Sequence, residues 1–205
     1  MNVQIEKIDT SRYNETMRKF VPKNAKLIPP QANCVFRGEI FDVYQWPQEL
    51  FDGATATFEM LKRDDTVKVI GIIDDKIVVT RQKQPGKDWF YDYPGGRNDH
   101  ADEDELAAAK REMLEETGME FANWKLVEVN QPYNKMDWLV YTFVATGFLG
   151  QKEQNLDGGE LIEVKCLDFE ELKRLSQDSE RFLHSKVLRQ VNSVEELENL
   201  PELKD

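Results

Sequence analysis

The N-terminal part of the chain has a pattern of apolar and polar positions that predicts strands. Its first 30 residues mix polar residues with scattered apolar ones, and a Pro-Pro pair then interrupts any regular element. Residues 34–46 and 54–61 are rich in β-branched and aromatic side chains, with partial period-two alternation. We therefore expect residues 1–62 to form an N-terminal β-rich segment.

Two apolar runs follow, VKVIGII at residues 67–73 and KIVVTRQ at residues 76–82. Only Asp74 and Asp75 separate them. Two runs of strand length joined by two turn-forming residues predict a β-hairpin.

A helix is predicted over residues 102–118, DEDELAAAKREMLEETG. Ala, Leu, Glu, Lys, Arg and Met dominate this stretch, and acidic residues crowd its first turn. Gly118 stands where a C-terminal cap is expected.

The rest of the chain returns to strands and then to helices. Residues 138–148, and more weakly 160–169, have strand character, whereas 169–177 and 178–191 have helical apolar spacing. The acidic tail at residues 193–205 is expected to fray. Strands that flank one central helix and lead to terminal helices predict an α/β fold, with a mixed sheet and helices on its faces.

Charge and composition narrow the function classes. The 205 residues are 40% hydrophobic, which is enough for a proper core, and carry a formal charge of −12. Such a surface repels phosphate backbones, so we expect no nucleic-acid partner. The N-terminus has neither a secretory nor a transit pattern, and no apolar run reaches membrane-spanning length. We expect a cytoplasmic protein with no membrane partner, and buried, unreactive positions for Cys34 and Cys166.

Three glutamates crowd one turn of the predicted central helix, although like charges at this spacing repel. On a helical wheel Glu112, Glu115 and Glu116 fall within an arc of about 100°, bordered by Ala108 and Ala109. One interpretation is a solvated acidic face, which is common in so negative a chain. The other is a site for a hard divalent cation, which holds closely spaced carboxylates ionised.

The segment upstream of the helix favours the cation site. The sequence YPGGRNDHADEDE contains a Pro-Gly-Gly turn whose flexible backbone can direct carbonyl groups towards a ligand. Carbonyl and carboxylate oxygens are ligands of Mg²⁺, which completes its shell with waters and substrate phosphates. The combination indicates a metal-phosphate site.

The segment GGRNDHADEDELAAAKREMLEETGM, residues 95–119, resembles the Nudix box. The family pattern is G, five residues, E, seven residues, R-E-U, one residue, E-E, one residue, G-U, where U is a bulky aliphatic residue. The spacing matches from Glu103 through Arg111 to Gly118 and Met119. One departure is that six residues, not five, separate Gly96 from Glu103. We interpret it as one extra loop residue, because the alternative, Asp102 in place of the first glutamate, breaks the interval to Arg111.

The resemblance implies an α/β/α sandwich over residues 63–205, with a C-terminal helix. It implies Mg²⁺-dependent hydrolysis, with Mn²⁺ as a second option, of a nucleoside diphosphate linked to another moiety. Glu112, Glu115 and Glu116 correspond to the family's metal ligands and Arg111 to the residue that orients them.

Similarity beyond the box, over roughly residues 35–175, is to the ADP-ribose pyrophosphatase branch. That branch implies ADP-ribose or a nucleotide sugar as substrate and a homodimer formed through the N-terminal strands. By the same comparison, the Gly95 carbonyl is expected to bind metal, and Glu160, with Glu163 as second choice, to help position the attacking water. Where the branch has a phosphate-binding arginine this chain has Gln84. The residues expected to contact substrate are Arg81, Asp92, Gly96 and Glu103, although for Asp92 a turn-facing carboxylate is an equal alternative.

Two other functions stay open. A house-cleaning hydrolase of nucleoside triphosphates is disfavoured by the long N-terminal segment, which compact members of the superfamily lack. A non-catalytic nucleotide sensor is disfavoured because such proteins often lose box carboxylates, and here all are kept.

Overall fold

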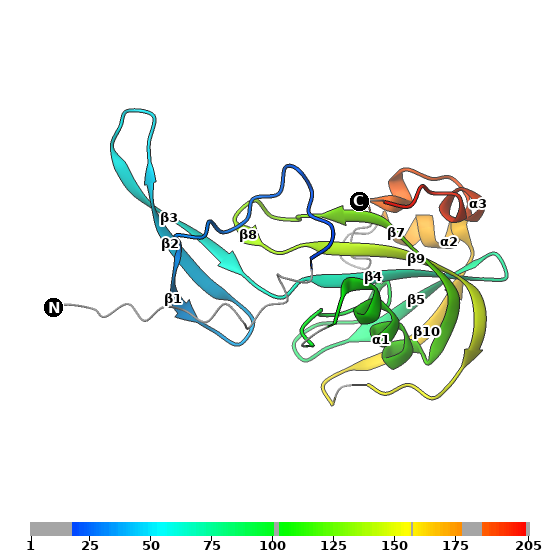
Figure 1. Cartoon of the computed structure of the whole chain (residues 1–205). Coiled ribbons are helices and arrows are strands. Elements are labelled where there is room, and N and C mark those ends of the chain that lie inside the picture. Colours follow the sequence, from blue (N-terminus) through cyan, green and yellow to red (C-terminus); the bar gives the residue numbers. More distant parts are fainter. Residues whose placement is uncertain (1–17, 101–102, 157, 178–185, 204–205) are drawn as a thin grey trace.

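The computed structural model describes residues 18–100, 103–156, 158–177 and 186–203 (Figure 1). Its strands form a four-stranded N-terminal sheet and a six-stranded main sheet. The N-terminal sheet contains, in spatial order, β1 (Asn33–Arg37), β2 (Asp42–Glu49), β3 (Thr55–Lys62) and β8 (Met136–Asp137). The main sheet contains, in spatial order, β10 (Leu161–Leu167), β5 (Lys76–Lys83), β4 (Thr66–Ile73), β9 (Val140–Gln151) and β7 (Met119–Asn130), and the short β6 (Phe90–Asp92) pairs with β5. The helices are α1 (Glu105–Thr117), α2 (Phe169–Leu175), the 3₁₀ turn η2 (Val187–Arg189) and α3 (Val194–Glu198).

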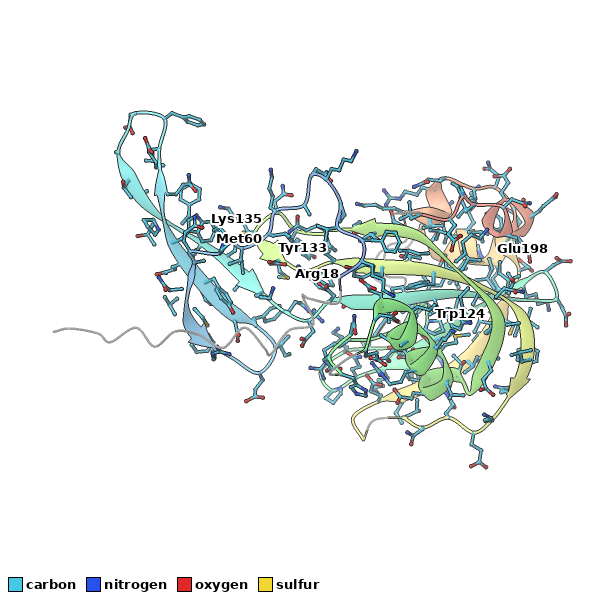
Figure 2. The ribbon with its side chains drawn as sticks, viewed as in Figure 1. Arg18, Met60, Trp124, Tyr133, Lys135 and Glu198 are labelled. Atoms are coloured by element: carbon cyan, nitrogen blue, oxygen red, sulfur yellow. The ribbon has the colours of Figure 1, made fainter. Side chains whose placement is uncertain are left out.

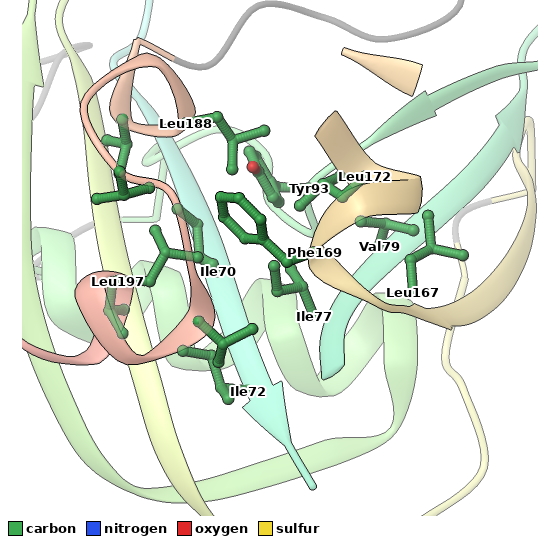
Figure 3. Close-up of a cluster of buried hydrophobic side chains, with 14 residues drawn as sticks. Ile70, Ile72, Ile77, Val79, Tyr93, Leu167, Phe169, Leu172, Leu188 and Leu197 are labelled. Carbon is green, nitrogen blue, oxygen red and sulfur yellow. The ribbon is translucent and has the colours of Figure 1, made fainter. Parts of the chain in front are cut away.

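Helices cover both faces of the main sheet. The sheet is mixed, because β4 and β9 run parallel while the other neighbouring strands run antiparallel. On one face, Met113 of α1 packs in a cluster with Val69 of β4. On the other face, Leu172 of α2 and Leu197 of α3 pack with Ile70 (Figure 3). The predicted α/β/α sandwich is confirmed.

Strand β4 is apolar on both sides because both of its faces are covered. Val69 and Ile70 point to opposite faces and are both fully buried. Gly71 faces α1, where a Cβ atom would come within 2.9 Å of the Met113 side chain. The missing side chain therefore lets the helix lie close to the sheet, which fixes the position of the glutamates that α1 carries.

The predicted hairpin is present as β4 and β5. Asp74 and Asp75 have φ angles of 49° and 58°, the left-handed backbone that a two-residue turn with matching twist requires. Asp tolerates this conformation better than most residues do.

The predicted central helix is also present as α1. The Asp104 side chain accepts a hydrogen bond from the Ala107 amide (2.8 Å), so the helix begins at Glu105, three residues later than the acidic run suggests. At the other end Gly118 has a φ of 71° and its amide donates to the Leu114 carbonyl at 2.8 Å.

The C-terminal region differs from its prediction. Residues 178–185 of the helix expected over 178–191 lie outside the described residues, and the remainder forms only the 3₁₀ turn η2. Within that turn the neighbouring residues Val187 and Leu188 are both buried, so core packing decides the local backbone.

The expectation of a fraying tail is wrong. Val194 and Leu197 are buried against the main sheet, so the tail forms α3 with its acidic residues outside. Lys125 of β7 donates to the carbonyls of Glu198 (2.5 Å) and Leu200 (2.8 Å). The apolar residues of the tail and one lysine from a distant strand thus anchor it.

The N-terminal sheet stands beside the main sheet (Figure 1). Its strand β8 comes from the chain after β7 and pairs in parallel with the end of β3. A short segment from the interior of the chain therefore completes this sheet.

The expectation that both cysteines are buried is also wrong. Cys166 is exposed and Cys34 is half-buried, because they lie on β10 and β1, each an outermost strand of its sheet. They form no disulfide with each other. No helix in the described part of the chain is long and apolar enough to cross a membrane.

Candidate functional site

The site is built from α1 and the loop at residues 94–98, which we call the box loop. Strand β4 fixes this loop, because the Val67 amide donates to the Gly96 carbonyl (2.9 Å) and the Val69 amide to the Pro94 carbonyl (2.8 Å). Gly95 has a φ of 149°, and a Cβ atom there would come within 2.0 Å of the Val67 carbonyl oxygen. The loop can therefore follow β4 this closely only with glycine at position 95.

Two of the three helical glutamates lie against the box loop. The Gly95 amide donates to Glu116 Oε2 at 2.9 Å. A Cβ atom on Gly96 would come within 2.5 Å of the Glu112 carboxylate, so that carboxylate lies directly over the glycine backbone. Glu115 is the most exposed of the three, with 34% of its side chain accessible.

Arg111 holds the acidic groups together. Its Nε and Nη2 atoms each lie 3.1 Å from the Glu103 carboxylate. Its Nη1 donates to Glu112 Oε1 (2.7 Å) and to Glu115 Oε2 (3.0 Å), and its Nη2 also donates to the Arg97 carbonyl (2.9 Å). This one guanidinium therefore links α1, the start of the helix and the box loop, which fits the orienting role expected for it.

Burial changes the pKa of two of these carboxylates. It raises the pKa of Glu116 well above the ordinary glutamate value, against the Gly95 amide and the charge of Lys68. Burial likewise raises the pKa of Glu112, against the charge and hydrogen bond of Arg111. Both carboxylates would therefore gain from a cation that holds them ionised.

The donor set suits a hard divalent cation, since Glu112 and Glu116 are partly desolvated carboxylates beside a glycine backbone. Between Glu112 and Glu115, however, it is Arg111 that provides the positive charge. Among the described residues no three His, Cys, Asp or Glu side chains gather as a metal cluster. The metal ligands stay a prediction that the chemistry of the site supports.

The loop that precedes β10 runs beside the C-terminal end of α1. The Asn155 amide donates to the Glu115 carbonyl (2.9 Å), and Gln154 Nε2 donates to the Glu116 carbonyl (2.5 Å). At its end Glu160 accepts a hydrogen bond from Gln84 at 3.4 Å. This arrangement brings the loop to the helix, although Glu160 itself contacts Gln84, the residue that follows β5.

The structure does not bring Arg81 to the helical glutamates. Its guanidinium lies 4.4 Å from the Trp89 ring centroid and 3.2 Å from the Glu163 carboxylate. Arg81 follows Ile77 and Val79 in the alternation of β5, and both of these face α2 and α3. Glu163 is therefore engaged on that side as well, and the hydrogen bond from Arg81 lowers its pKa.

Two more of the predicted contact residues, Asp92 and Glu103, already have partners. Asp92 is buried, forms an ion pair with Lys68 and accepts a hydrogen bond from the Tyr93 amide (2.8 Å). Glu103 binds Arg111, as described above. Sequence analysis did not identify Lys68, although a lysine within an otherwise apolar strand is a signal for a buried ion pair.

Comparisons with known proteins agree with the observed fold. The NUDIX domain model matches residues 62–190, more than half of the chain. A solved structure described as an ADP compounds hydrolase superposes with a TM-score of 0.62 at 17% identity, over 78% of this chain and 88% of that one. A NUDIX hydrolase from Nitrosomonas europaea superposes with a TM-score of 0.54 at 20% identity, over 68% of this chain and 93% of that one. A sequence search of curated proteins returned no match. The chain therefore belongs to the NUDIX domain family and is a hydrolase.

Proposed function

We propose that the protein hydrolyses the pyrophosphate bond of a nucleoside diphosphate linked to another moiety, with ADP-ribose or a nucleotide sugar as substrate. The observation that carries the proposal is the placement of the α1 glutamates. Glu112 and Glu116 lie against the glycine backbone of the box loop, and Arg111 joins Glu112 to Glu115. The similarity to a fold described as an ADP compounds hydrolase supports the same substrate class.

In this proposal Glu112, Glu115 and Glu116, with the Gly95 carbonyl, hold Mg²⁺ or Mn²⁺. When bound, the cation neutralises pyrophosphate oxygens and lowers the pKa of a bound water. Arg111 keeps the carboxylates oriented, and the Gly96 backbone lies where the diphosphate approaches. Glu160 helps to position the attacking water from the loop beside α1.

A panel of substrates tests the proposal. Purified protein is incubated with ADP-ribose, a nucleotide sugar or a nucleoside triphosphate, in the presence of Mg²⁺, Mn²⁺ or EDTA, and the products are separated. We expect a nucleoside monophosphate and a sugar phosphate in the presence of either cation and no product in EDTA. Pyrophosphate from the triphosphate alone would identify the house-cleaning function instead. Binding of ADP-ribose without any product would identify a sensor.

We also propose a homodimer formed through the N-terminal sheet, and a cytoplasmic location. Large apolar side chains are unusually exposed on this sheet and its turns, at Val35 (53%), Phe36 (60%), Ile40 (52%) and Phe51 (114%). Such groups are typical of a surface that a partner covers.

A further inference from the structure

Residues 18–20, which we call the strap, lie well outside the NUDIX match but touch the start of the catalytic helix. The Lys19 amide donates to Glu105 Oε1 at 3.0 Å, and Glu105 is only 3% exposed. Lys19 Nζ contacts Asp104, the N-cap of α1, at 2.6 Å. The carbonyl of Phe20 accepts a hydrogen bond from the Tyr141 hydroxyl (3.0 Å). The strap is thus bonded to α1 and to the main sheet.

Arg18 forms a buried ionic cluster at the junction of the two sheets (Figure 2). Its guanidinium binds both carboxylate oxygens of Asp65, at 2.6 and 2.7 Å, and Asp137 Oδ1 at 2.9 Å. Lys62 Nζ lies 3.5 Å from the other oxygen of Asp137. These four side chains are between 3% and 8% exposed. Two basic and two acidic side chains thus face one another with little access to water.

Asp65 connects this cluster to the box loop through backbone hydrogen bonds. Its carbonyl accepts a hydrogen bond from the Asn98 amide at 2.8 Å, and the next residue, Thr66, forms a β-bridge with Arg97. The Arg97 carbonyl in turn accepts a hydrogen bond from Arg111 Nη2 (2.9 Å). A continuous series of contacts therefore runs from Arg18 through Asp65 and the loop to the arginine that holds the glutamates.

We propose that Arg18 is a positioning residue for the hydrolytic site, which it supports through Asp65 and the box loop. The inference rests on the proposed function, and Arg18 does not itself contact the glutamates. A neutral residue at position 18 removes the cation that bridges Asp65 and Asp137, which keep the amides of Leu139 and Ile28 and, for Asp137, Lys62 at 3.5 Å. Two buried carboxylates without this bridge are strongly destabilising, so the junction rearranges and the backbone at Asp65 loosens. The box loop then loses the support that sets the places of Arg111, Glu112 and Glu116.

The test compares Arg18→Met with Lys125→Met. Lys125 anchors the C-terminal tail on the far face of the main sheet, so its variant loses stability without disturbing the box loop. For Arg18→Met we expect a fall in kcat of about tenfold or more, as for other residues that orient active-site ligands, with KM changed by less than about threefold. Hydrogen exchange at the Asn98 amide should be faster than in the wild type. Lys125→Met should keep the wild-type kcat and Asn98 exchange rate.

If Arg18→Met does not fold, Arg18→Lys tests the proposal in its place. Lysine retains the buried charge but has a single nitrogen in place of the planar fork that binds Asp65 through two nitrogens and Asp137 through a third, so the same changes in kcat and Asn98 exchange are expected in weaker form. A kcat within about twofold of the wild type in the folded variants, or an unchanged Asn98 exchange rate, overturns the proposal. If the wild type cleaves none of the nucleotide substrates, the proposed function fails, and exchange at Asn98 alone still decides the role of Arg18.

Discussion

At the scale of single residues, a small number of groups holds several carboxylates close together in the site. Arg111 contacts Glu103, Glu112 and Glu115, while Glu116 relies on the Gly95 amide. Neutral glutamine keeps the size of each glutamate but removes the charge that the proposed chemistry needs.

Glu112→Gln and Glu116→Gln should therefore each lower kcat by orders of magnitude and leave the fold intact. The change is small in volume, so circular dichroism spectra should match those of the wild type. Steady-state hydrolysis of ADP-ribose measures the effect, with Glu120→Gln as the control because this glutamate lies on β7 and pairs with Lys152. Undiminished turnover in both site variants contradicts the assigned roles.

Gly95→Ala should damage both stability and activity. A methyl group there would collide with the Val67 carbonyl, whereas at Gly53, also at positive φ (80°), nothing lies within 4 Å. Gly53→Ala should cost about 1 kcal/mol of unfolding free energy from backbone strain alone, and Gly95→Ala clearly more. Urea unfolding measures both, and equal costs would show that the close approach to β4 is not limiting.

At the scale of elements, the sequence predicted those helices and strands whose formation depends on residues close together in the chain. The hairpin follows from its two aspartates, and α1 from its acidic first turn, its composition and its glycine stop, whereas the cap at Asp104 is seen only in the structure. The tail helix α3 depends instead on packing of its apolar residues against the main sheet, a surface that exists only once the sheet has folded. Likewise the box spacing identified the carboxylates on α1, but no spacing reveals that Arg81 packs on Trp89 or that Asp92 pairs with Lys68.

The start of α1 gives a pH dependence that is independent of metal. Burial raises the pKa of Glu105 above the ordinary glutamate value, although the Lys19 amide and the charge of Lys19 oppose it. A raised pKa in the folded state adds stability below the unfolded pKa of about 4.3, which is lost as pH rises through the folded value. Glu105→Gln keeps the hydrogen-bond acceptor and does not titrate.

The unfolding free energy of the wild type, minus that of Glu105→Gln, should therefore decrease between pH 4 and pH 7. Urea unfolding of both proteins at several pH values provides the difference, in which titrations common to both cancel. A difference that stays flat or increases with pH contradicts the assigned direction.

Leu197→Ala tests the anchoring of α3. The side chain is fully buried, so its truncation should lower the unfolding free energy by about 2–5 kcal/mol. Because α3 lies on the face opposite α1, kcat at a temperature where the variant is folded should stay at the wild-type value. Leu203→Ala is the control, since that side chain is 38% exposed and should matter little. Equal stability of the two variants would show that the tail is not anchored as described.

At the scale of the whole molecule, two sheets of different character lie side by side. Helices cover both faces of the main sheet, which still exposes Leu149 on β9 and Leu161 on β10, whereas the N-terminal sheet and its turns leave a larger group of apolar side chains in water. We propose that a second copy of the chain buries these side chains.

Light scattering should therefore give a mass of about twice the 23.9 kDa of one chain. Phe36→Asp places a charge in the proposed interface and should shift the protein to the monomer. Leu149→Asp is the matched control, because Leu149 is similarly exposed (68%) but lies on β9. A wild type that is monomeric at micromolar concentration, or an unaffected Phe36→Asp dimer, contradicts the proposed interface.

The position of the two-residue strand β8 limits how this protein can be divided into fragments. They belong by sequence to the matched family region but complete the other sheet, beside the end of β3. A gene fragment cut near residue 62 would leave β8 without its strand partner and Asp137 without Arg18. Exchange of modules with relatives at that boundary would therefore disrupt both sheets, so recombination that preserves the fold must keep residues 18–62 together with the rest of the chain.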